Sequence, residues 1–272
     1  VGVPAFIVTL AGMLIFRGLA ILIVGETIAG LPEGFVGISN AGLLGTLGFA
    51  GAADVLTLVI GIAGIAAFVF SQLRTRATMR SHNLKVEPGS MFLTKLVGVS
   101  LLLAVFTWIL SQSAIGTPYV LILVAVLIFA YGFLMGRTVF GRHVYAIGGN
   151  VHAAVLSGVN VKTMNFRIFI NMGLLASLAA VVTTSRAGAA LAAAGNNYEL
   201  DAIAACFIGG TAVTGGVGKV SGVIVGALIM GVLNMGLSII GTNPALQNVI
   251  KGLVLLIAVA FDLINKRRAA GA

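Results

Sequence analysis

Apolar runs of about 20 residues recur along the whole chain, separated by short polar or glycine-rich segments. A helix of that length crosses the hydrocarbon core of a bilayer, which is about 30 Å thick. Of the 272 residues, 59% are hydrophobic and only 8% are charged, whereas soluble domains carry about 25% charged residues. So few charges cannot cover a water-facing surface, and the runs are too long for the alternating strands of an outer-membrane barrel. The sequence therefore predicts an all-α integral membrane protein, a polytopic helical bundle in a single transmembrane domain over residues 1–272.

We expect about eight spans, one of them short or broken. The long spans are predicted near residues 3–24, 52–73, 92–112, 118–136, 168–186, 220–240 and 248–264. The remaining one, from Leu200 to Val213, is too short to cross as a straight helix, and it runs into the glycine-rich stretch Ile208–Lys219. Non-helical backbone at membrane depth is tolerated where protein or a water-filled cavity covers it. We interpret this stretch as a broken span that helps to line a pathway.

Basic residues indicate which segments face the cytoplasm. Of the 16 Lys and Arg residues, 12 lie in two polar segments and the tail, counting Lys95 at the edge of the first segment. Five of the seven acidic residues lie at the opposite ends of the spans. The positive-inside rule then predicts cytoplasmic loops at about 74–91 and 137–167 and a cytoplasmic C-terminus, with exterior segments at 25–48 and 187–199. The net charge of +9 does not indicate nucleic-acid binding, because the basic residues lack aromatic interleaving and any recognisable nucleic-acid module.

The polar segment from Gly141 to Arg167 contains a short amphipathic pattern. Asn150 can cap a helix and Gly158 can end one in the left-handed conformation. Between them Val151, Ala154 and Val155 share one face. Either this helix lies on the lipid headgroups, or it docks a soluble partner. For the second interpretation, the predicted contact residues are Asn150, Ala153, Ala154, Ser157 and Gly158.

The sequence has no visible catalytic, cofactor or metal site, so we do not expect an enzyme. The glycine-rich stretch fails the phosphate-loop spacing, because Gly218 and Lys219 are followed by Val220 and the position five before Gly218 is Val213. It fails the dinucleotide pattern as well, because Ser221 stands where the third glycine belongs. Close packing is the better explanation, and Gly132 with Gly136, or Gly222 with Gly226, has the spacing that lets helices approach.

Four stretches, Pro4–Ala20, Ala146–Val161, Asn196–Leu237 and Lys251–Asp262, carry a resemblance that covers essentially the whole chain. They resemble the permease subunits of bacterial ABC importers for monosaccharides, the ribose, galactose and xylose group. The basic segment Arg74–Met91 looks most like the xylose-type permease. The resemblance implies the ABC importer permease fold in a bacterial inner membrane, and further spans before Val1. It also implies a second permease copy, cytoplasmic ATPase subunits that hold ATP and Mg, and a sugar-binding protein outside.

The resemblance implies import of a monosaccharide, D-xylose or a related pentose by preference, with ribose, galactose or another sugar as alternatives. An ion-coupled secondary transporter is a weaker alternative, because its coupling acid should lie in mid-span, whereas the acids here lie near span ends. A structural or receptor membrane protein is a third alternative.

Charged or polar residues in or beside spans are candidates to line a pathway. They compete with plainer interpretations: solvation at span ends for three of the charges, an internal salt bridge for Arg17, and a helix contact for Asn234. The candidates are Arg17, Arg186, Glu199, Asp201 and Asn234.

Overall fold

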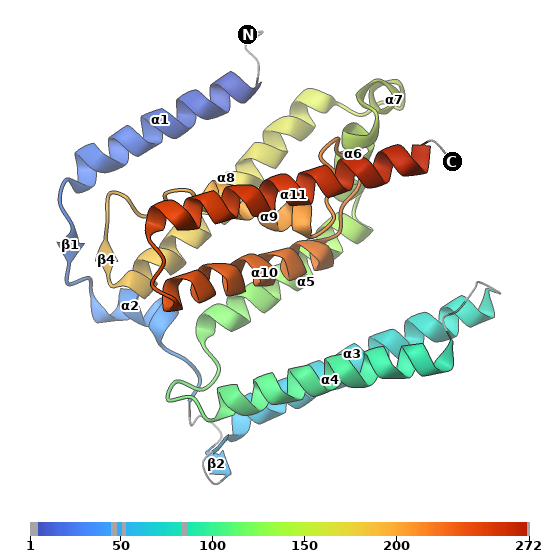
Figure 1. Ribbon diagram of the computed structural model, residues 1–272, viewed down its shortest axis with the longest axis horizontal. Helices are drawn as coiled ribbons and strands as arrows, with labels where there is room; N and C mark the ends of the chain where they lie inside the picture. The colour runs from blue at the N-terminus through green and yellow to red at the C-terminus, as the bar shows by residue number, and fades with distance from the viewer. Residues whose placement is uncertain (1–4, 45–47, 51–52, 83–85, 87, 271–272) are drawn as a thin grey trace. The chain divides into compact units, whose positions relative to one another are not determined.

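The computed structural model describes residues 5–44, 48–50, 53–82, 86 and 88–270, and the described chain is mostly helical (Figure 1). The longer helices are α1 (Ala5–Val24), α3 (Val55–Ser81), α4 (Gly89–Ser111), α5 (Tyr119–Arg137), α8 (Val161–Ala187), α10 (Val220–Ile239) and α11 (Pro244–Ala270). The shorter ones are α2 (Glu33–Asn40), α6 (Val139–Gly149), α7 (Val151–Leu156) and α9 (Tyr198–Ile208). Strand β1 (Ile28–Ala29) pairs with β4 (Ala189–Ala190), and β2 (Phe49–Ala50) pairs with β3 (Ala53–Asp54), both antiparallel.

The helical membrane architecture predicted from the sequence is confirmed. Six helices, α1, α3, α4, α5, α8 and α10, are long and apolar enough to cross a membrane, and α11 has a shorter apolar part, Pro244–Ala260. With the short α9, these helices correspond to the eight predicted spans. The predicted start of the first span at Val3 and Pro4, and Lys85 in the first basic segment, lie outside the described residues.

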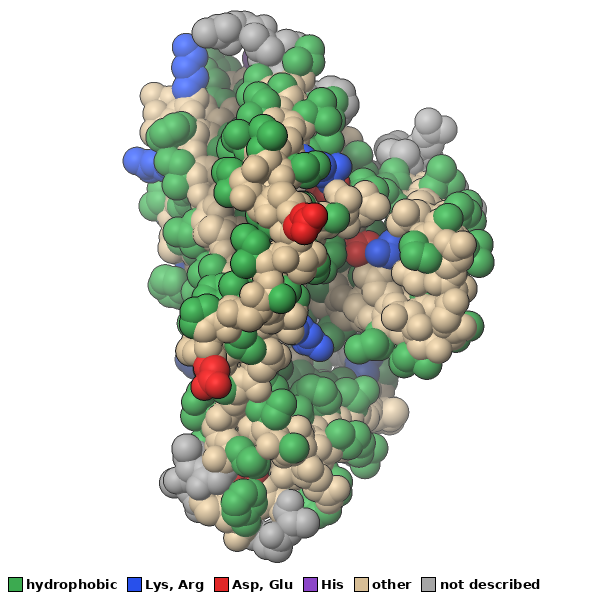
Figure 2. Space-filling view, turned by 90° about the vertical axis from the view of Figure 1, so that its left-hand side faces the viewer, with side chains coloured by type: hydrophobic (Ala, Val, Ile, Leu, Met, Phe, Trp, Pro, Cys, Tyr) green, Lys and Arg blue, Asp and Glu red, His purple; other side chains and the backbone are tan. Residues whose placement is uncertain are grey.

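Large apolar side chains are exposed around the long helices. Phe16 is 73% exposed, Leu22 81% and Phe129 77%. Figure 2 shows one face on which hydrophobic side chains are widespread and charged side chains are isolated. Helices that are apolar on all sides belong in a membrane or inside a larger assembly.

The chain divides into two units, residues 31–123 and residues 1–30 with 124–272. In the first unit, α3 and α4 form a hairpin whose closest approach is at Gly61, where a Cβ would stand 2.0 Å from Thr107 Cγ2. Asp54 begins α3, because its carboxylate accepts hydrogen bonds from the Thr57 nitrogen and hydroxyl at 2.9 and 2.7 Å. The backbone at residues 41–43 pairs with 117–119, which joins the end of the segment predicted to be exterior to the start of α5.

In the other unit, α9 packs between α10 and α11, while α6, α7 and α8 form a second group. The C-terminal end of α11 lies at the same end of this unit as α6 and α7, and the β1–β4 pair lies at the opposite end (Figure 1). This separation is what the predicted topology requires of the α6–α7 segment and the tail at one end and of residues 25–30 and 187–199 at the other, while the side of the membrane that each end faces stays a prediction.

The two segments predicted as cytoplasmic loops are largely helical, and their extent outside the membrane stays a prediction. In the segment predicted as a loop at 137–167, α6, α7 and the first two turns of α8 occupy most of the residues. In the segment at 74–91, α3 continues to Ser81 and α4 starts at Gly89. Hydrophobic runs mark the parts of helices that meet lipid. Helices continue beyond those runs where polar residues follow and side chains cap the helix ends. Thr138 caps α6 by accepting from the Gly141 nitrogen, and Asn160 caps α8 by accepting from the Thr163 nitrogen.

Candidate functional site

The predicted caps of the short helix α7 are both present. The side-chain oxygen of Asn150 accepts a hydrogen bond from the Ala153 nitrogen at 3.0 Å. At the other end, Gly158 adopts the left-handed conformation with φ +83°, which glycine reaches without a steric penalty. The Ser157 hydroxyl donates to the Ala153 carbonyl at 2.9 Å. Sequence reasoning therefore located this element and its ends correctly.

The predicted exposed face of α7 is wrong at Ala154, which is only 3% exposed. Ala154 packs with Val159 and Met164 against Phe140, Val144 and Ile147, so its methyl group anchors α7 to α6 and α8. The prediction failed because the surrounding segment was expected to be a loop, whereas α6 and α8 supply a surface that buries the small residue. Ala154 is not available to a partner.

The side chains that α7 does present to its surroundings are larger than predicted. Leu156 is 89% exposed, Val155 53% and Val151 46%. Ala153, Ser157 and Gly158 are exposed as well. Sequence reasoning missed Leu156 because it searched for small residues, although a leucine in a polar segment is itself a signal of a contact surface.

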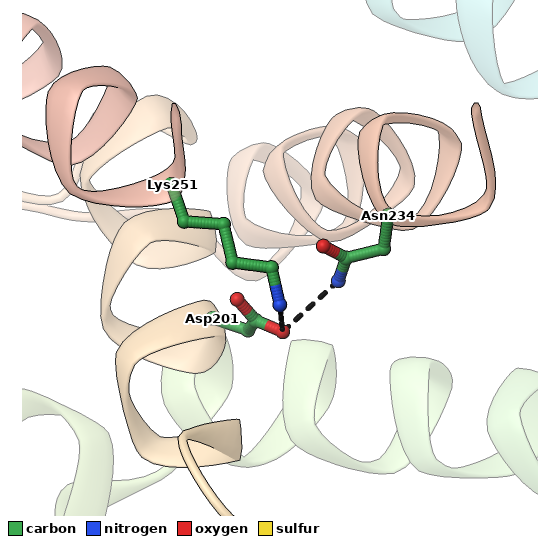
Figure 3. Close-up of polar contacts among 3 residues, drawn as sticks. All are labelled: Asp201, Asn234 and Lys251. Carbon is green, nitrogen blue, oxygen red and sulfur yellow. Dashed lines mark hydrogen bonds and ion pairs between the residues drawn. The ribbon is translucent and has the colours of Figure 1, made fainter. Parts of the chain in front are cut away.

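Two of the predicted pathway residues, Asp201 and Asn234, lie together in a polar cluster (Figure 3). Lys251 Nζ stands 3.0 Å from Asp201 Oδ2, and Asn234 Nδ2 donates to the same oxygen at 2.9 Å. The three side chains come from α11, α9 and α10, so the cluster ties three helices together. The Asn234 contact is therefore the helix contact that was the plainer interpretation.

Lys251 was missed as a functional candidate because it stands at the head of an apolar run. The signal that could have identified it was a single Lys beside an apolar run, in a chain with few acidic residues to pair with it. The pair is only partly accessible, with 18% of each side chain exposed. Asp201 Oδ1 and Asn234 Oδ1 are buried without a hydrogen-bond partner among the described residues. Such buried acceptors are costly, so the ion pair and the hydrogen bond to Asp201 Oδ2 must offset that cost.

The other pathway candidates do not join this cluster. Arg17 Nη2 stands 3.3 Å from Glu199 Oε1, and these side chains are 38% and 43% exposed. This is the internal salt bridge that competed with a pathway role for Arg17. Arg186 lies in the last turn of α8 and is exposed, where a positive charge favours the helix C-terminus. The five candidates thus form one buried cluster, one exposed pair and one separate arginine.

The broken span is present as predicted. Helix α9 has 11 residues, which corresponds to about 16 Å at the rise of an α-helix, and irregular backbone follows it up to Lys219. Its packing explains one of the two predicted glycine pairs. A Cβ on Gly222 would stand 2.1 Å from the Gly209 oxygen, and one on Gly226 would stand 1.9 Å from the Ala205 oxygen. A Cβ on Gly132 or Gly136 would meet nothing within 4 Å in the described chain.

The glycine-rich stretch also touches α6. The Tyr145 hydroxyl donates a hydrogen bond to the Gly218 carbonyl oxygen at 3.0 Å. A Cβ on Gly148 would stand 2.5 Å from the Gly216 nitrogen, and one on Gly216 would stand 2.6 Å from Gly149 Cα. Backbones this close leave no room for side chains. The break between α9 and α10 is therefore covered by protein, because α6 lies directly against it.

Comparison with known proteins identifies the family. The family model described as branched-chain amino acid transport system / permease component matches residues 1–259. The chain belongs to this permease family. No solved structure matches it significantly.

Curated relatives are permease proteins of sugar transport systems. The chain is 41% identical over 272 residues to the xylose transport system permease protein of Escherichia coli K12, covering 98% of this chain and 66% of the relative. The Haemophilus influenzae protein of the same name is 38% identical over 266 residues, covering 98% and 68%. The ribose import permease protein of Bacillus subtilis is 48% identical over 129 residues, covering 47% and 40%.

These relatives confirm the predicted resemblance to monosaccharide permeases, and the xylose transport system permease proteins align over 98% of the chain. The chain spans about two thirds of the length of the xylose relatives.

Among the described residues, no group of three or more His, Cys, Asp and Glu side chains could hold a metal ion.

Proposed function

We propose that this chain is the membrane-spanning permease subunit of an ATP-driven importer that moves a monosaccharide into the bacterial cytoplasm across the inner membrane. The observation that carries the proposal is the alignment of 98% of the chain to a xylose transport system permease protein at 41% identity. D-xylose or a related pentose is the preferred cargo. Ribose is the second candidate, because ribose import permease proteins align over part of the chain.

In this proposal the energy comes from separate cytoplasmic ATPase subunits that bind ATP and Mg. The chain itself offers no phosphate-binding loop, and ATP-driven movement therefore has to enter through a contact with another subunit. A sugar-binding protein on the outer side delivers the cargo, and a second permease copy completes the pathway. The wide exposure of apolar side chains on the long helices fits a chain that faces both lipid and a second copy.

The proposed ATPase contact is α7 with its flanking residues. The positive-inside rule places this segment and the C-terminus in the cytoplasm. Val151, Val155 and Leu156 form the exposed apolar surface, and the small residues Ala153 and Ser157 beside it permit close approach. A contact of this kind, an apolar helix face in a partner's groove, is a common mode of recognition.

The ion-coupled alternative is disfavoured by the state of Asp201. A coupling acid must exchange its ion during each cycle, but Asp201 is held by Lys251 at 3.0 Å and lies in the first turn of α9. A fixed positive partner opposes the entry of a cation at this carboxylate.

The test is sugar uptake by the complete system in proteoliposomes. The permease is reconstituted with a candidate ATPase and a candidate sugar-binding protein, with ATP inside or outside the vesicles. We expect radiolabelled xylose uptake that requires ATP on the cytoplasmic side and that is competed by unlabelled xylose. Uptake driven by an ion gradient without the ATPase would refute the proposal. Competition by ribose or hexoses alone would overturn the preference for xylose.

A further inference from the structure

The contact between α6 and the break that separates α9 from α10 connects two parts of the chain that are about 70 residues apart in sequence. Tyr145 binds the Gly218 carbonyl from the side, while Gly148 and Gly149 lie directly against Gly215 and Gly216. Tyr145 is partly buried. The contact combines a directed hydrogen bond with backbone-to-backbone packing, so a movement of α6 is passed to residues 215–218 of the break.

The same helix α6 carries α7. Ala154 of α7 is packed among Phe140, Val144 and Ile147 of α6, with Val159 and Met164 completing the cluster. A force applied to the exposed side of α7 is therefore passed to α6, because close-packed side chains transmit displacement with little compression.

On its far side, the break is continuous with α9. Gly209 lies against Gly222, and Ala205 lies against Gly226, so the end of α9 is seated on α10 without intervening side chains. Helix α9 in turn carries Asp201, which binds Lys251 of α11 and Asn234 of α10. A displacement of the break can reach this cluster along α9, from its C-terminal end at Ile208 back to Asp201 in its first turn.

The break itself is built for conformational change. Gly210, Gly215 and Gly216 have φ of +82°, +84° and +75°, a region that glycine enters freely. Inside it, the Ala212 nitrogen donates to the Val217 oxygen at 2.9 Å and the Gly215 nitrogen donates to the Ala212 oxygen at 3.0 Å. Two turn-type hydrogen bonds and glycine backbone resist deformation much less than the helices on either side.

We propose that the contact of Tyr145, Gly148 and Gly149 with Gly215, Gly216 and Gly218 transmits movement from the ATPase-facing helix α7 to the broken span, so that α9 is the element that the ATPase repositions. Tyr145 is a positioning residue in this mechanism. The proposal rests on the proposed function, since it assumes that α7 contacts an ATPase. Coupling of this kind requires an element with two arrangements that both ends bias, and the glycine-rich break is that element.

The experiment uses the complete reconstituted transporter and measures sugar imported per ATP hydrolysed. Tyr145→Phe removes one hydrogen bond without changing the shape of the ring. We expect the ratio to fall about two- to tenfold, the range that corresponds to one net intramolecular hydrogen bond. Gly148→Ala introduces a Cβ against the Gly216 nitrogen and should lower the ratio further. In both variants, co-purification with the ATPase and basal ATP hydrolysis should equal those of the wild type.

Matched controls separate transmission from general destabilisation. Tyr131→Phe also removes a tyrosine hydrogen bond between elements, to Asn171 Oδ1 at 2.6 Å, but it lies away from the break. Gly132→Ala places a Cβ where nothing lies within 4 Å. Both controls should keep the wild-type ratio of sugar to ATP.

A second readout follows the break directly. A spin label at Val217, which is 65% exposed, is introduced by Val217→Cys in a Cys206→Ala background. In the complete transporter we expect its mobility to change when ATP is added, and Tyr145→Phe should remove most of that change. This readout does not depend on Gly148→Ala folding.

The outcomes are distinguishable. If the wild type imports sugar, and Tyr145→Phe keeps both the wild-type ratio and the ATP-dependent change at Val217, the transmission proposal is overturned while the proposed function stands. If the wild-type complex neither binds an ATPase nor imports sugar, the proposed function itself fails.

Discussion

Replacing Lys251 by Met tests whether the cluster on α9, α10 and α11 stabilises the bundle. The substitution keeps most of the side-chain length but leaves Asp201 with the Asn234 amide as its remaining partner in the cluster. Removing one partner of a buried ion pair costs about 3–5 kcal/mol. Since 18% of each side chain is exposed, we expect the lower end of this range, about 3 kcal/mol.

The matched control is Arg17→Met, which breaks the exposed pair with Glu199. Those side chains are 38% and 43% exposed. Glu199 lies in the segment predicted to be exterior, and pairs that water reaches contribute about 0–1 kcal/mol. The two substitutions remove the same kind of charge, so a difference between them measures the effect of burial.

The assay is thermal unfolding of the purified permease in nanodiscs. With a shift of about 2–4 °C per kcal/mol for chains of comparable length, Lys251→Met should lower the midpoint by about 6–12 °C, and Arg17→Met by at most about 4 °C. Adding Asp201→Asn to Lys251→Met should recover part of the loss, because the unpaired charge is removed. Two results would refute the reasoning. Either Lys251→Met shifts the midpoint no more than Arg17→Met does, or the double variant shows no recovery relative to Lys251→Met. In both cases the cluster does not stabilise the bundle through a buried ion pair.

Three further predictions concern α7, α10 and the energy source. Leu156→Asp should reduce co-purification with the ATPase at least tenfold while leaving thermal stability unchanged. Ala154→Arg should lower thermal stability, because residues of this chain already fill the space around Ala154. Equal effects of the two substitutions on stability would contradict the assignment of exposed and buried faces. Gly226→Val should destabilise the permease by several kcal/mol, since even a Cβ would overlap the Ala205 oxygen, while Gly132→Val should be near neutral in nanodisc unfolding. The purified chain without an ATPase should release no phosphate from ATP, and turnover by a partner-free preparation would refute this.

The sequence alone determined the membrane class, the order of the apolar helices and the ends of α7. These features follow from local physics: long apolar runs prefer lipid, Asn150 satisfies a helix N-terminus, and Gly158 reaches the left-handed conformation. The short length of α9 and its glycine-rich break were also visible, because helix rise and bilayer thickness are fixed quantities. The length of helix in the polar segments was underestimated, because hydrophobic runs predict only the apolar parts of helices.

The tertiary structure decided which of the local signals are used. Two glycine pairs had the same spacing, but only Gly222 and Gly226 meet another backbone, because α9 lies against α10 and no described element lies against Gly132 and Gly136. Ala154 is buried because α6 and α8 surround it. Asp201 meets Lys251, 50 positions away in sequence, and Tyr145 meets Gly218, 73 positions away. Contacts of that separation depend on how whole helices pack, and a single sequence encodes that packing only in the sum of many weak interactions.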